Sequence, residues 1–198
     1  MYTVIGAPYT RTMRVLWCLE ELGLSYKLNA AYPQSDDIKS VNPSGKVPAL
    51  LDGDDVIIDS VAICQHLADK HNAMTFPAGS IERAHMQSWL YFANDEVEAP
   101  LWTWWKHAKV RPPEEQVADV LPICEKEFHR AMKIFEARLG DNEFVMGDTF
   151  SVPDIILTHC ANWAQTGCEF TMRKGKVSAY FERMRSRPAY KKAMAVKA

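Results

Sequence analysis

The stretch TVIGAPYTRTMRVLWCLEELGLSYKLNAA, residues 3–31, decides the fold. Its first four residues are an apolar run typical of a short strand. Residues 13–23, MRVLWCLEELG, carry apolar side chains at helical spacing and end in Gly23, a common helix terminator. Residues 25–31, SYKLNAA, are a second short strand-like run. The stretch therefore predicts a strand, a helix and a strand, which open an α/β domain.

The residues that follow complete this domain. A loop with a short helix over 35–45 leads to a strand in VPALL (47–51), a turn at LDGDD and a strand in VIID (56–59). Only a tight turn separates the two apolar runs, so they predict a hairpin. A helix is expected to start at Ser60. The predicted order is β-α-β-α-β-β-α within residues 1–75.

Residues 80–198 contain only helical patterns, so we expect an all-α second domain there. The linker 71–80, HNAMTFPAGS, separates the two halves. The predicted helices run from Ser80 through Trp105 with a kink at Pro100, from Val117 to Leu139, from Val152 to Ala164 and from Gly175 to Met184, with a last turn from Pro188.

Two of these helices carry apolar stripes that we expect to face the core. The first stripe contains Ile81, His85, Trp89, Phe92 and Glu96. The second contains Val120, Ile123, Cys124, Phe128, Met132 and Phe135.

Composition narrows the functional class. The chain has 198 residues, 47% of them hydrophobic, and a formal net charge of -2. The high share of hydrophobic residues excludes a disordered chain, and the near-zero net charge excludes a polyanion-binding module. Without a run of about 18 apolar residues or a signal-peptide pattern, we expect a soluble, cytoplasmic protein that does not associate with membranes. The basic segment after Thr171 has few aromatic residues, so we expect solvated helix faces there and no nucleic acid partner.

The cysteines and histidines argue against disulfides and metals. The five cysteines are odd in number and widely spaced, and neither CxxC nor CxxxC occurs. The six histidines never lie four residues apart beside a carboxylate. We therefore expect neither a disulfide framework nor a metal site.

Three short segments carry possible chemistry, and GKVPALL (45–51) is the first. Pro48 precedes a predicted strand, and proline removes a ladder donor. It either simply starts the strand or forms a cis bond with Val47. In the second case, the amide and carbonyl of Val47 would face a ligand instead of the sheet.

The second segment is VIIDSVAI (56–63), where an acid and a serine precede a helix. Ser60 suits an N-cap, and Asp59 would lie in the positive field of the helix end. In one interpretation both residues only cap the helix. In the other, Ser60 and free amides bind a ligand carboxylate while Asp59 binds an ammonium group, as a zwitterionic amino-acid end requires.

The third segment is GAPYTRTMRVLW (6–17), where Tyr9, Thr10 and Thr12 surround a helix start. Thr10 or Thr12 could serve only as an N-cap. A hydroxyl group at a helix N-terminus is also suited to stabilising a thiolate.

Taken in order, these segments resemble the glutathione transferase family. The R-V-L-W helix, the N-P-x-G-K-V-P-A-L loop and the D-S-V-A-I turn have the family's order and spacing, and GDTFSVPDIIL (147–157) resembles its buried capping motif, with Ser151 as N-cap and Asp154 reaching back to it. The resemblance covers residues 1 to about 187. It implies a thioredoxin-like domain followed by an all-helical domain, a homodimer, and reduced glutathione as co-substrate.

The resemblance also implies roles for single residues in glutathione binding. Val47 would supply backbone hydrogen bonds to the cysteinyl part, with Pro48 as the cis proline. Asp59 and Ser60 would hold the γ-glutamyl end. Lys46 would neutralise the glycyl carboxylate, although it could equally be a solvated loop lysine.

At the catalytic position the sequence departs from the family pattern. Tyr9 stands where serine-type members carry serine, Thr10 follows, and Arg11 takes the place of the cysteine in cysteine-type members. Without a thiol in this turn, thiol exchange is not expected, and Cys18 is expected in the core. Tyr9 is the more acidic donor and Thr10 lies closer to the helix start, with Arg11 adding charge, so both hydroxyls remain candidates.

A second substrate would need an apolar wall. The aromatic segment with Trp102, Trp105 and His107 is the predicted site, with Trp163 as a further candidate. Such clusters also form cores and dimer interfaces.

The activity implied is conjugation of the glutathione thiolate to a small hydrophobic electrophile. The alternatives are a glutathione-binding or hydrophobic-ligand-binding protein of the same fold with little transferase activity, and a glutathione-dependent isomerase or peroxidase.

Overall fold

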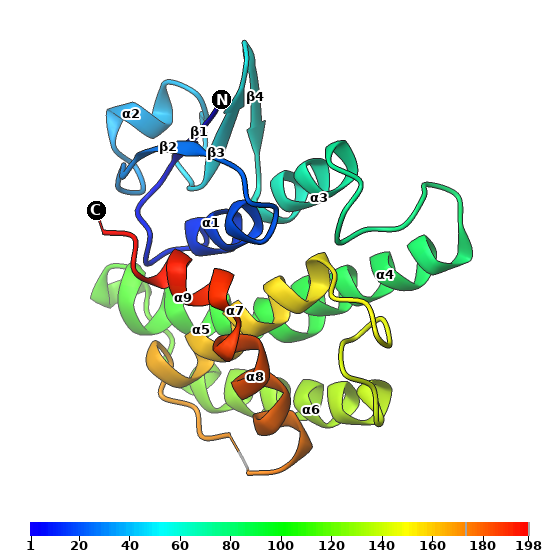
Figure 1. The fold of residues 1–198 in the computed structure, drawn as a ribbon. Coiled ribbons are helices and arrows are strands. Elements are labelled where there is room, and N and C mark those ends of the chain that lie inside the picture. The colour runs from blue at the N-terminus through cyan, green and yellow to red at the C-terminus, as the bar shows by residue number, and fades with distance from the viewer. Residues whose placement is uncertain (173, 198) are drawn as a thin grey trace. The chain divides into compact units, whose positions relative to one another are not determined.

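The computed structural model describes residues 1–172 and 174–197. Contacts divide the chain into two units, one formed by residues 1–78 together with the segment from Arg185 onward, and one by residues 79–184. The elements of the first unit before the linker are β1 (Tyr2–Ile5), α1 (Thr12–Glu21), β2 (Tyr26–Asn29), α2 (Asp36–Lys39), β3 (Ala49–Asp52), β4 (Asp55–Ile58) and α3 (Ser60–Lys70) (Figure 1). This is the predicted β-α-β-α-β-β-α order.

The four strands form one mixed sheet in the order β2-β1-β3-β4. β1 pairs with β2 in parallel and with β3 antiparallel, and β3 and β4 form the predicted hairpin. The parallel pair requires a crossover, which α1 provides.

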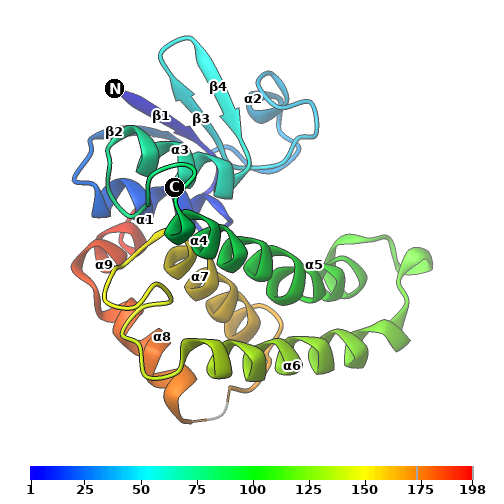
Figure 2. The ribbon, with the colours of Figure 1, turned by 90° about the vertical axis from the view of Figure 1, so that its right-hand side faces the viewer.

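The sheet is covered on both faces because successive residues of a strand point to opposite sides. Ile5 and Ala49 pack with Ile38 of α2 in one buried cluster. Val4 and Leu50, which are fully buried, point to the other face, where α1 and α3 pack against the strands and each other (Figure 2).

The C-terminal helix α9 (Pro188–Met194) packs on α1 of the first unit. The rings of Trp17 and Tyr190 meet edge to face with centroids 5.0 Å apart. Arg187 donates two hydrogen bonds, of 2.6 and 2.8 Å, to the carboxylate of Glu21. We expected the second domain to extend over residues 80–198, but the segment from Arg185 onward groups with the first unit because its apolar face is buried against α1.

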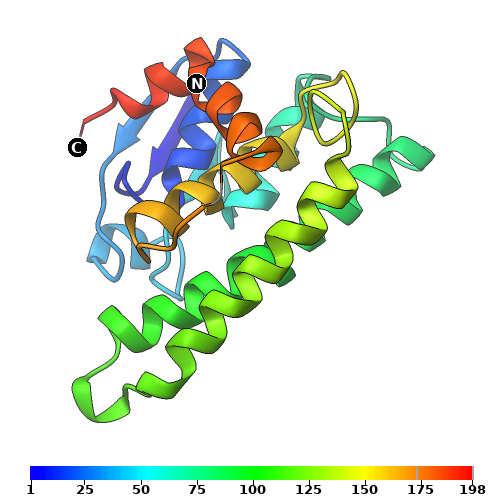
Figure 3. The same ribbon diagram turned by 90° about the horizontal axis from the view of Figure 1, so that it is seen from below.

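The second unit is built from helices. They are α4 (Ile81–Phe92), the π-helix η1 (Ala93–Glu98), α5 (Ala99–Trp105), the π-helix η2 (Lys106–Val110), the 3-10 turns η3 (Pro113–Glu115) and η4 (Ala118–Val120), α6 (Leu121–Leu139), α7 (Val152–Thr166) and most of α8 (Lys176–Ser186). α6 runs alongside the α4-to-α5 segment (Figure 3).

The irregularity expected at Pro100 lies just before it. Pro100 is fully helical but has no amide proton, so it cannot donate a helical hydrogen bond to the preceding turn. The chain widens into the π-helix η1 immediately before α5 begins. Because α5 continues directly from η1, the amide of Ala99 bonds to the carbonyl oxygen of Asn94, whereas Pro100 has no amide proton to make such a bond.

The predicted apolar stripe of α4 is wrong in its first half. Ile81 and His85 are exposed, and the buried positions are instead Met86, Trp89 and Leu90, continued by Ala93 and Val97 in η1. The predicted stripe and the observed buried face both have helical spacing, and both contain Trp89. Which of the two faces is buried therefore depends on the helix that packs against α4.

The second predicted stripe contains one error as well. Ile123 in the first turn of α6 is 53% exposed, whereas Cys124, Phe128, Met132 and Phe135 are buried. Ile123 lies next to the buried position 124 on the helix, at the margin of the apolar face, so spacing alone could not exclude it.

The buried capping motif at the start of α7 is confirmed. The backbone amide of Ser151 donates to the Asp154 carboxylate at 2.8 Å, and the Ser151 hydroxyl donates to it at 3.0 Å. Two more donors converge on the same carboxylate, the amide of Val145 at 3.0 Å and the Tyr180 hydroxyl at 2.6 Å. Asp154 therefore joins the start of α7 to α8 and to the preceding loop.

Candidate active site

Four segments leave the sheet at the same end, and three of them carry predicted site residues. Ile5 at the end of β1 lies between Asn29 and Ala49, and Ala49 lies opposite Ile58. Strands β1, β2 and β4 end on this row and β3 begins there. The turn into α1, the loop after β2, the Lys46–Val47 segment and the start of α3 are therefore neighbours, although they are far apart in the chain.

The hydroxyl group of Thr10 organises the turn into α1. It donates to the carbonyl oxygen of Ala7 at 2.7 Å and accepts from the amide of Thr12 at 3.2 Å. The hydroxyl oxygens of Thr10 and Thr12 lie 2.9 Å apart. The N-cap of α1 is Arg11, and its side chain makes no capping hydrogen bond, so neither Thr10 nor Thr12 is the N-cap. Thr10 instead orders the turn just before the helix, and Thr12, the first residue of α1, is buried.

Gly6 allows this turn to approach the loop before β3. A Cβ atom on Gly6 would lie 2.2 Å from the hydroxyl oxygen of Thr12 and 3.0 Å from Cβ of Val47. The backbone of Gly6 also has a φ of +148°, which disfavours other residues. Sequence analysis did not single out Gly6, although a glycine directly after a strand is a signal for close backbone approach.

The Val47–Pro48 peptide bond is cis, which was one of the two predicted alternatives. The loop before it is braced by Asn42, which is 4% exposed. The side-chain amide of Asn42 donates to the carbonyl oxygen of Lys46 at 2.8 Å, and its oxygen accepts from the amide and hydroxyl of Ser44. Sequence analysis missed this role of Asn42, which positions the backbone one residue before Val47.

Asp59, not Ser60, is the N-cap of α3. Its carboxylate accepts hydrogen bonds from the amides of Val61 at 2.9 Å and Ala62 at 3.2 Å. Asp59 is exposed and has a φ of +74°, a left-handed conformation that is costly for a residue other than glycine. The expectation that Ser60 caps the helix is wrong because Ser60 already has helical geometry as the first residue of α3.

The side chain of Ser60 is turned into the protein. Ser60 is 2% exposed, and its hydroxyl oxygen accepts a hydrogen bond of 3.1 Å from the guanidinium of Arg14, which is 1% exposed. A positive charge from α1 is thereby held behind the start of α3. Arg14 was missed because charged residues are seldom fully buried, so a lone arginine in an apolar helix pattern predicts an exposed position.

Tyr9 and Arg11 flank Thr10 with different exposure. Tyr9 is 70% exposed and contacts Tyr32, with ring centroids 6.4 Å apart, whereas Arg11 is half-buried. Partial desolvation and the neighbouring Tyr32 raise the pKa of the Tyr9 phenol.

The predicted aromatic residues of the second unit form a cluster, with one exception. Trp163 lies between Trp102 and Trp105, with ring centroids 6.4 and 6.1 Å away, and all three rings are half-buried. His107 instead accepts a hydrogen bond at Nδ1 from the amide of Val117, 3.1 Å away. His107 therefore holds the segment after η2.

Two family models match this chain, and together they cover most of it. Residues 1–75 match the N-terminal domain of glutathione S-transferase, and residues 99–188 match its C-terminal domain. The chain belongs to the glutathione S-transferase family.

Similar members of this family come from plants and bacteria. Glutathione S-transferase F14 of Arabidopsis thaliana is 25% identical, over 92% of this chain and 78% of that protein. The structure of a glutathione transferase from Methylococcus capsulatus is 28% identical, with a TM-score of 0.87 over 98% of this chain and 97% of that one.

Two further similar proteins were found. A glutathione transferase family member from Pseudomonas fluorescens, solved with two glutathione bound, shares the fold at 22% identity and a TM-score of 0.84, over 98% of this chain and 92% of that one. Elongation factor 1-gamma of Prunus avium is 27% identical over 97% of this chain, which spans only 44% of that protein.

The cysteines of this glutathione S-transferase family member are free and buried. Cys18 is fully buried, and its thiol donates to the carbonyl oxygen of Cys64 at 3.8 Å. Hydrogen bonding with Cys64, together with burial, raises the pKa of the Cys18 thiol well above its usual value. Cys18 is therefore a core residue, as expected, and not a reactive thiolate.

Neither a metal cluster nor a membrane helix is found in the part of the chain that the structure describes. Those residues include no group of three or more His, Cys, Asp or Glu side chains placed to hold a metal ion. None of their helices is long and apolar enough to cross a bilayer.

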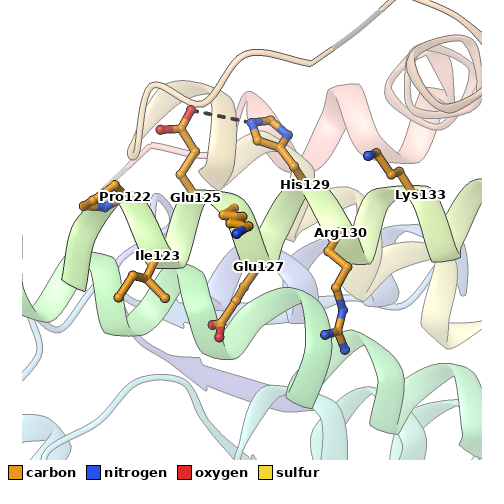
Figure 4. Close-up of a pocket in the computed structure, with 8 residues that line it drawn as sticks. Pro122, Ile123, Glu125, Glu127, His129, Arg130 and Lys133 are labelled. Carbon is orange, nitrogen blue, oxygen red and sulfur yellow. Dashed lines mark ion pairs between the residues drawn. The ribbon is translucent and has the colours of Figure 1, made fainter. Parts of the chain in front are cut away.

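An open hollow of about 720 Å³ runs along α6 over residues 122–133 (Figure 4). Glu125 and His129 form an ion pair of 3.5 Å on one side of it. All the residues that line it belong to α6, and none of them is a predicted site residue. The hollow is a surface of mixed charge and does not belong to the candidate active site.

Proposed function

We propose that the protein is a glutathione transferase that joins the thiolate of reduced glutathione to a small hydrophobic electrophile. The sulfur forms a bond to the electrophilic carbon, and the leaving group departs with its electron pair. The observation that carries this proposal is the row of residues Ile5, Asn29, Ala49 and Ile58, from which the helix-start hydroxyls, the cis-proline loop and the start of α3 all emerge.

Glutathione would extend along this edge, from the turn into α1 across β3 to β4. The backbone of Val47, ahead of cis Pro48, would bind the cysteinyl part. Asp59 would bind the ammonium group of the γ-glutamyl end, with the start of α3 facing its carboxylate. The Ser60 hydroxyl is turned into the protein and would act only from behind, through Arg14. Lys46 is exposed, and its ammonium group is free to approach the glycyl carboxylate.

The buried Arg14 supports this placement electrostatically. Its guanidinium lies behind Ser60, so the start of α3 combines the partial positive charge of a helix N-terminus with a full charge held in a low-dielectric interior. The exposed carboxylate of Asp59 supplies the opposite charge beside it. A zwitterionic group matches this pair of charges.

The thiol would be ionised at the start of α1. Lowering its pKa from about 8.5 to about 6.5 requires about 2.7 kcal/mol of preferential thiolate stabilisation. A hydrogen bond to a charged acceptor supplies roughly 1.5 to 3 kcal/mol, and a helix N-terminus adds up to about 2 kcal/mol. One hydroxyl group, from Thr10 or Tyr9, would therefore suffice, with Arg11 as an additional positive charge.

The hydroxyl groups of Thr10 and Tyr9 differ in their surroundings, and each has one feature against it as the group that activates the thiol. Thr10 lies at the helix start, but its proton points to the carbonyl oxygen of Ala7 and must rotate to reach a sulfur atom. Tyr9 is exposed, but its ring contacts Tyr32 and its pKa is raised. For the electrophile, the half-buried rings of Trp102, Trp105 and Trp163 offer an apolar wall; His107 would shape it indirectly.

One observation favours a second candidate, a glutathione-binding protein with little transferase activity. The Thr10 hydroxyl already has a donor and an acceptor within the turn, as a hydroxyl with a purely structural role would have. The resemblance to elongation factor 1-gamma is consistent with a role other than detoxification.

Calorimetry and turnover together separate the candidates. We expect glutathione to bind, and we expect turnover with at least one of a chlorinated nitroarene, an isothiocyanate and an organic peroxide. Binding without turnover would favour the second candidate, and peroxide turnover alone would favour a peroxidase. Absence of glutathione binding would overturn the proposal.

A further inference from the structure

Three successive carbonyl groups are held by hydrogen bonds in the loop before β3. Gln34 donates from its side-chain amide to the carbonyl oxygen of Ser44 at 2.9 Å, and from its backbone amide to that of Gly45 at 2.8 Å. The side-chain amide of Asn42 donates to the carbonyl oxygen of Lys46 at 2.8 Å. Each of these three peptide units therefore has a fixed direction.

The last of these donors, Asn42, is anchored to the core beneath the sheet. Asn42 is 4% exposed, and its backbone amide donates to the carbonyl oxygen of Ile38 at 2.8 Å. Ile38 is fully buried in the cluster that contains Ile5 and Ala49 of the sheet. The hydrogen bond from Asn42 therefore holds Lys46 relative to the sheet itself, and not only relative to a neighbouring loop.

The bond to Lys46 decides where the next amide points. The Lys46–Val47 peptide bond is trans, because Val47–Pro48 is the one cis bond in the part of the chain that the structure describes. In a planar trans peptide unit, the carbonyl group and the following N–H group point in opposite directions. Asn42 holds the carbonyl oxygen of Lys46 on its own side, so the N–H group of Val47 points away from Asn42. Among the described residues, none accepts a hydrogen bond from this amide, and Val47 is only half-buried.

We propose that Asn42 is a positioning residue that directs the N–H group of Val47 toward the ligand. This inference rests on the proposed function, in which the backbone of Val47 binds the cysteinyl part of glutathione. The N–H group would donate to the carbonyl oxygen of that cysteinyl residue. Without the side-chain amide of Asn42, the peptide unit between Lys46 and Val47 loses the bond that fixes its direction. Glutathione binding must then supply the ordering that the free protein already has, and its affinity falls.

Amide exchange and calorimetry together test this role without requiring turnover. NMR measures how fast the Val47 N–H group exchanges with water, with and without saturating glutathione, and calorimetry measures the affinity. Asn42→Asp keeps the size and the acceptor for Ser44, but an ionised carboxylate cannot donate to Lys46. Asn42→Ala repeats the test without a carboxyl group. Ser44→Ala is the matched control, because it removes a hydrogen bond on the other side of Asn42 and keeps the donor to Lys46.

In the wild type and in Ser44→Ala, we expect glutathione to slow the exchange of the Val47 amide by about ten-fold. In Asn42→Asp and Asn42→Ala this protection should be lost, and glutathione should bind about five-fold more weakly, as loss of one neutral hydrogen bond predicts.

The amides of β3 report whether each variant is folded, and Asn42→Asp decides the question should Asn42→Ala unfold. Unchanged affinity in Asn42→Asp, or a Val47 amide that glutathione still protects in that variant, would overturn the inference. If the wild type bound glutathione without protecting Val47, the inference alone would fail. If the wild type bound no glutathione, the proposed function would fail as well.

Discussion

The hydroxyl oxygen of Ser60 accepts a hydrogen bond from the guanidinium of Arg14, and both side chains are almost completely buried. The bond joins α3 to α1 beneath the candidate glutathione site. Removing the hydroxyl would deprive a buried charge of an acceptor, so substitution of Ser60 would affect stability and ligand binding together. The exposed neighbour Asp59 is therefore the better residue for testing ligand binding.

Asp59→Asn should weaken glutathione binding by at least about ten-fold, which corresponds to about 1.4 kcal/mol. Asparagine caps a helix as well as aspartate does and tolerates a positive φ, so the melting temperature should stay within a few degrees of wild type. Calorimetry measures the affinity. Asp59→Ala is the comparison, because it should lose stability as well as affinity. Unchanged affinity in Asp59→Asn would contradict an ammonium contact at this position.

The hydroxyl that activates the thiol should be revealed by titration. If Thr10 is responsible, Thr10→Ala raises the pKa of bound glutathione by about 1 to 2 units, as loss of one charged hydrogen bond predicts, and Tyr9→Phe does not. The reverse result would assign the role to Tyr9. The ultraviolet absorbance of the thiolate, followed against pH with glutathione bound, reports this pKa.

Thr10→Ser is the matched control for this titration, because it keeps the hydroxyl group and its hydrogen bonds within the turn. Cys18→Ala should lower stability without changing the titration. If neither Thr10→Ala nor Tyr9→Phe moves the pKa, the hydroxyl assignment is wrong, and the helix N-terminus with Arg11 must ionise the thiol.

Asp154→Ala should lower the free energy of unfolding by about 3 kcal/mol or more. The substitution leaves the amides of Val145 and Ser151 and the hydroxyl of Tyr180 without their acceptor in a buried site. Urea denaturation measures the loss. Tyr180→Phe, which removes only one of these bonds, should cost less. A mutant as stable as the wild type would show that the carboxylate does not hold α7 and α8 together.

Asp52 should contribute to stability at neutral pH and not in acid. Hydrogen bonds from Lys70 and then His66 lower the pKa of its carboxyl group below the ordinary value. Because the pKa of this carboxyl group is lower in the folded state, Asp52 stabilises the fold at pH values above its unfolded-state pKa of about 3.9. The contribution is lost as the pH falls through the folded-state pKa. The difference in stability between wild type and Asp52→Asn should therefore shrink between pH 7 and pH 3. A constant difference would contradict this.

The protein should form a homodimer, as the family resemblance implies. The surface expected to associate includes Tyr91 and Phe92 of α4. Tyr91 is 68% exposed, whereas Phe92 is buried against Trp89 in its own unit. Light scattering at micromolar concentration should give twice the chain mass of 22.5 kDa. A mass equal to that of one chain would contradict the prediction.

Local signals determined much of this protein. The order of strands and helices follows from the spacing of apolar residues, which is two residues in a strand and three to four in a helix. The capping motif of Ser151 and Asp154 depends only on their three-residue interval. The candidate cis bond at Pro48 and the hydroxyl groups around Thr10 were visible for the same reason. Each of these features depends on residues within one turn or one strand.

The tertiary structure alone decided which of these residues meet. The pairs Arg14 with Ser60 and Glu21 with Arg187 lie 46 and 166 positions apart. The contact of Tyr9 with Tyr32 needs the register of two parallel strands, and the buried face of α4 needs its packing partner. Spacing within a segment cannot encode these choices, because burial and long-range hydrogen bonds depend on the surface that another segment presents.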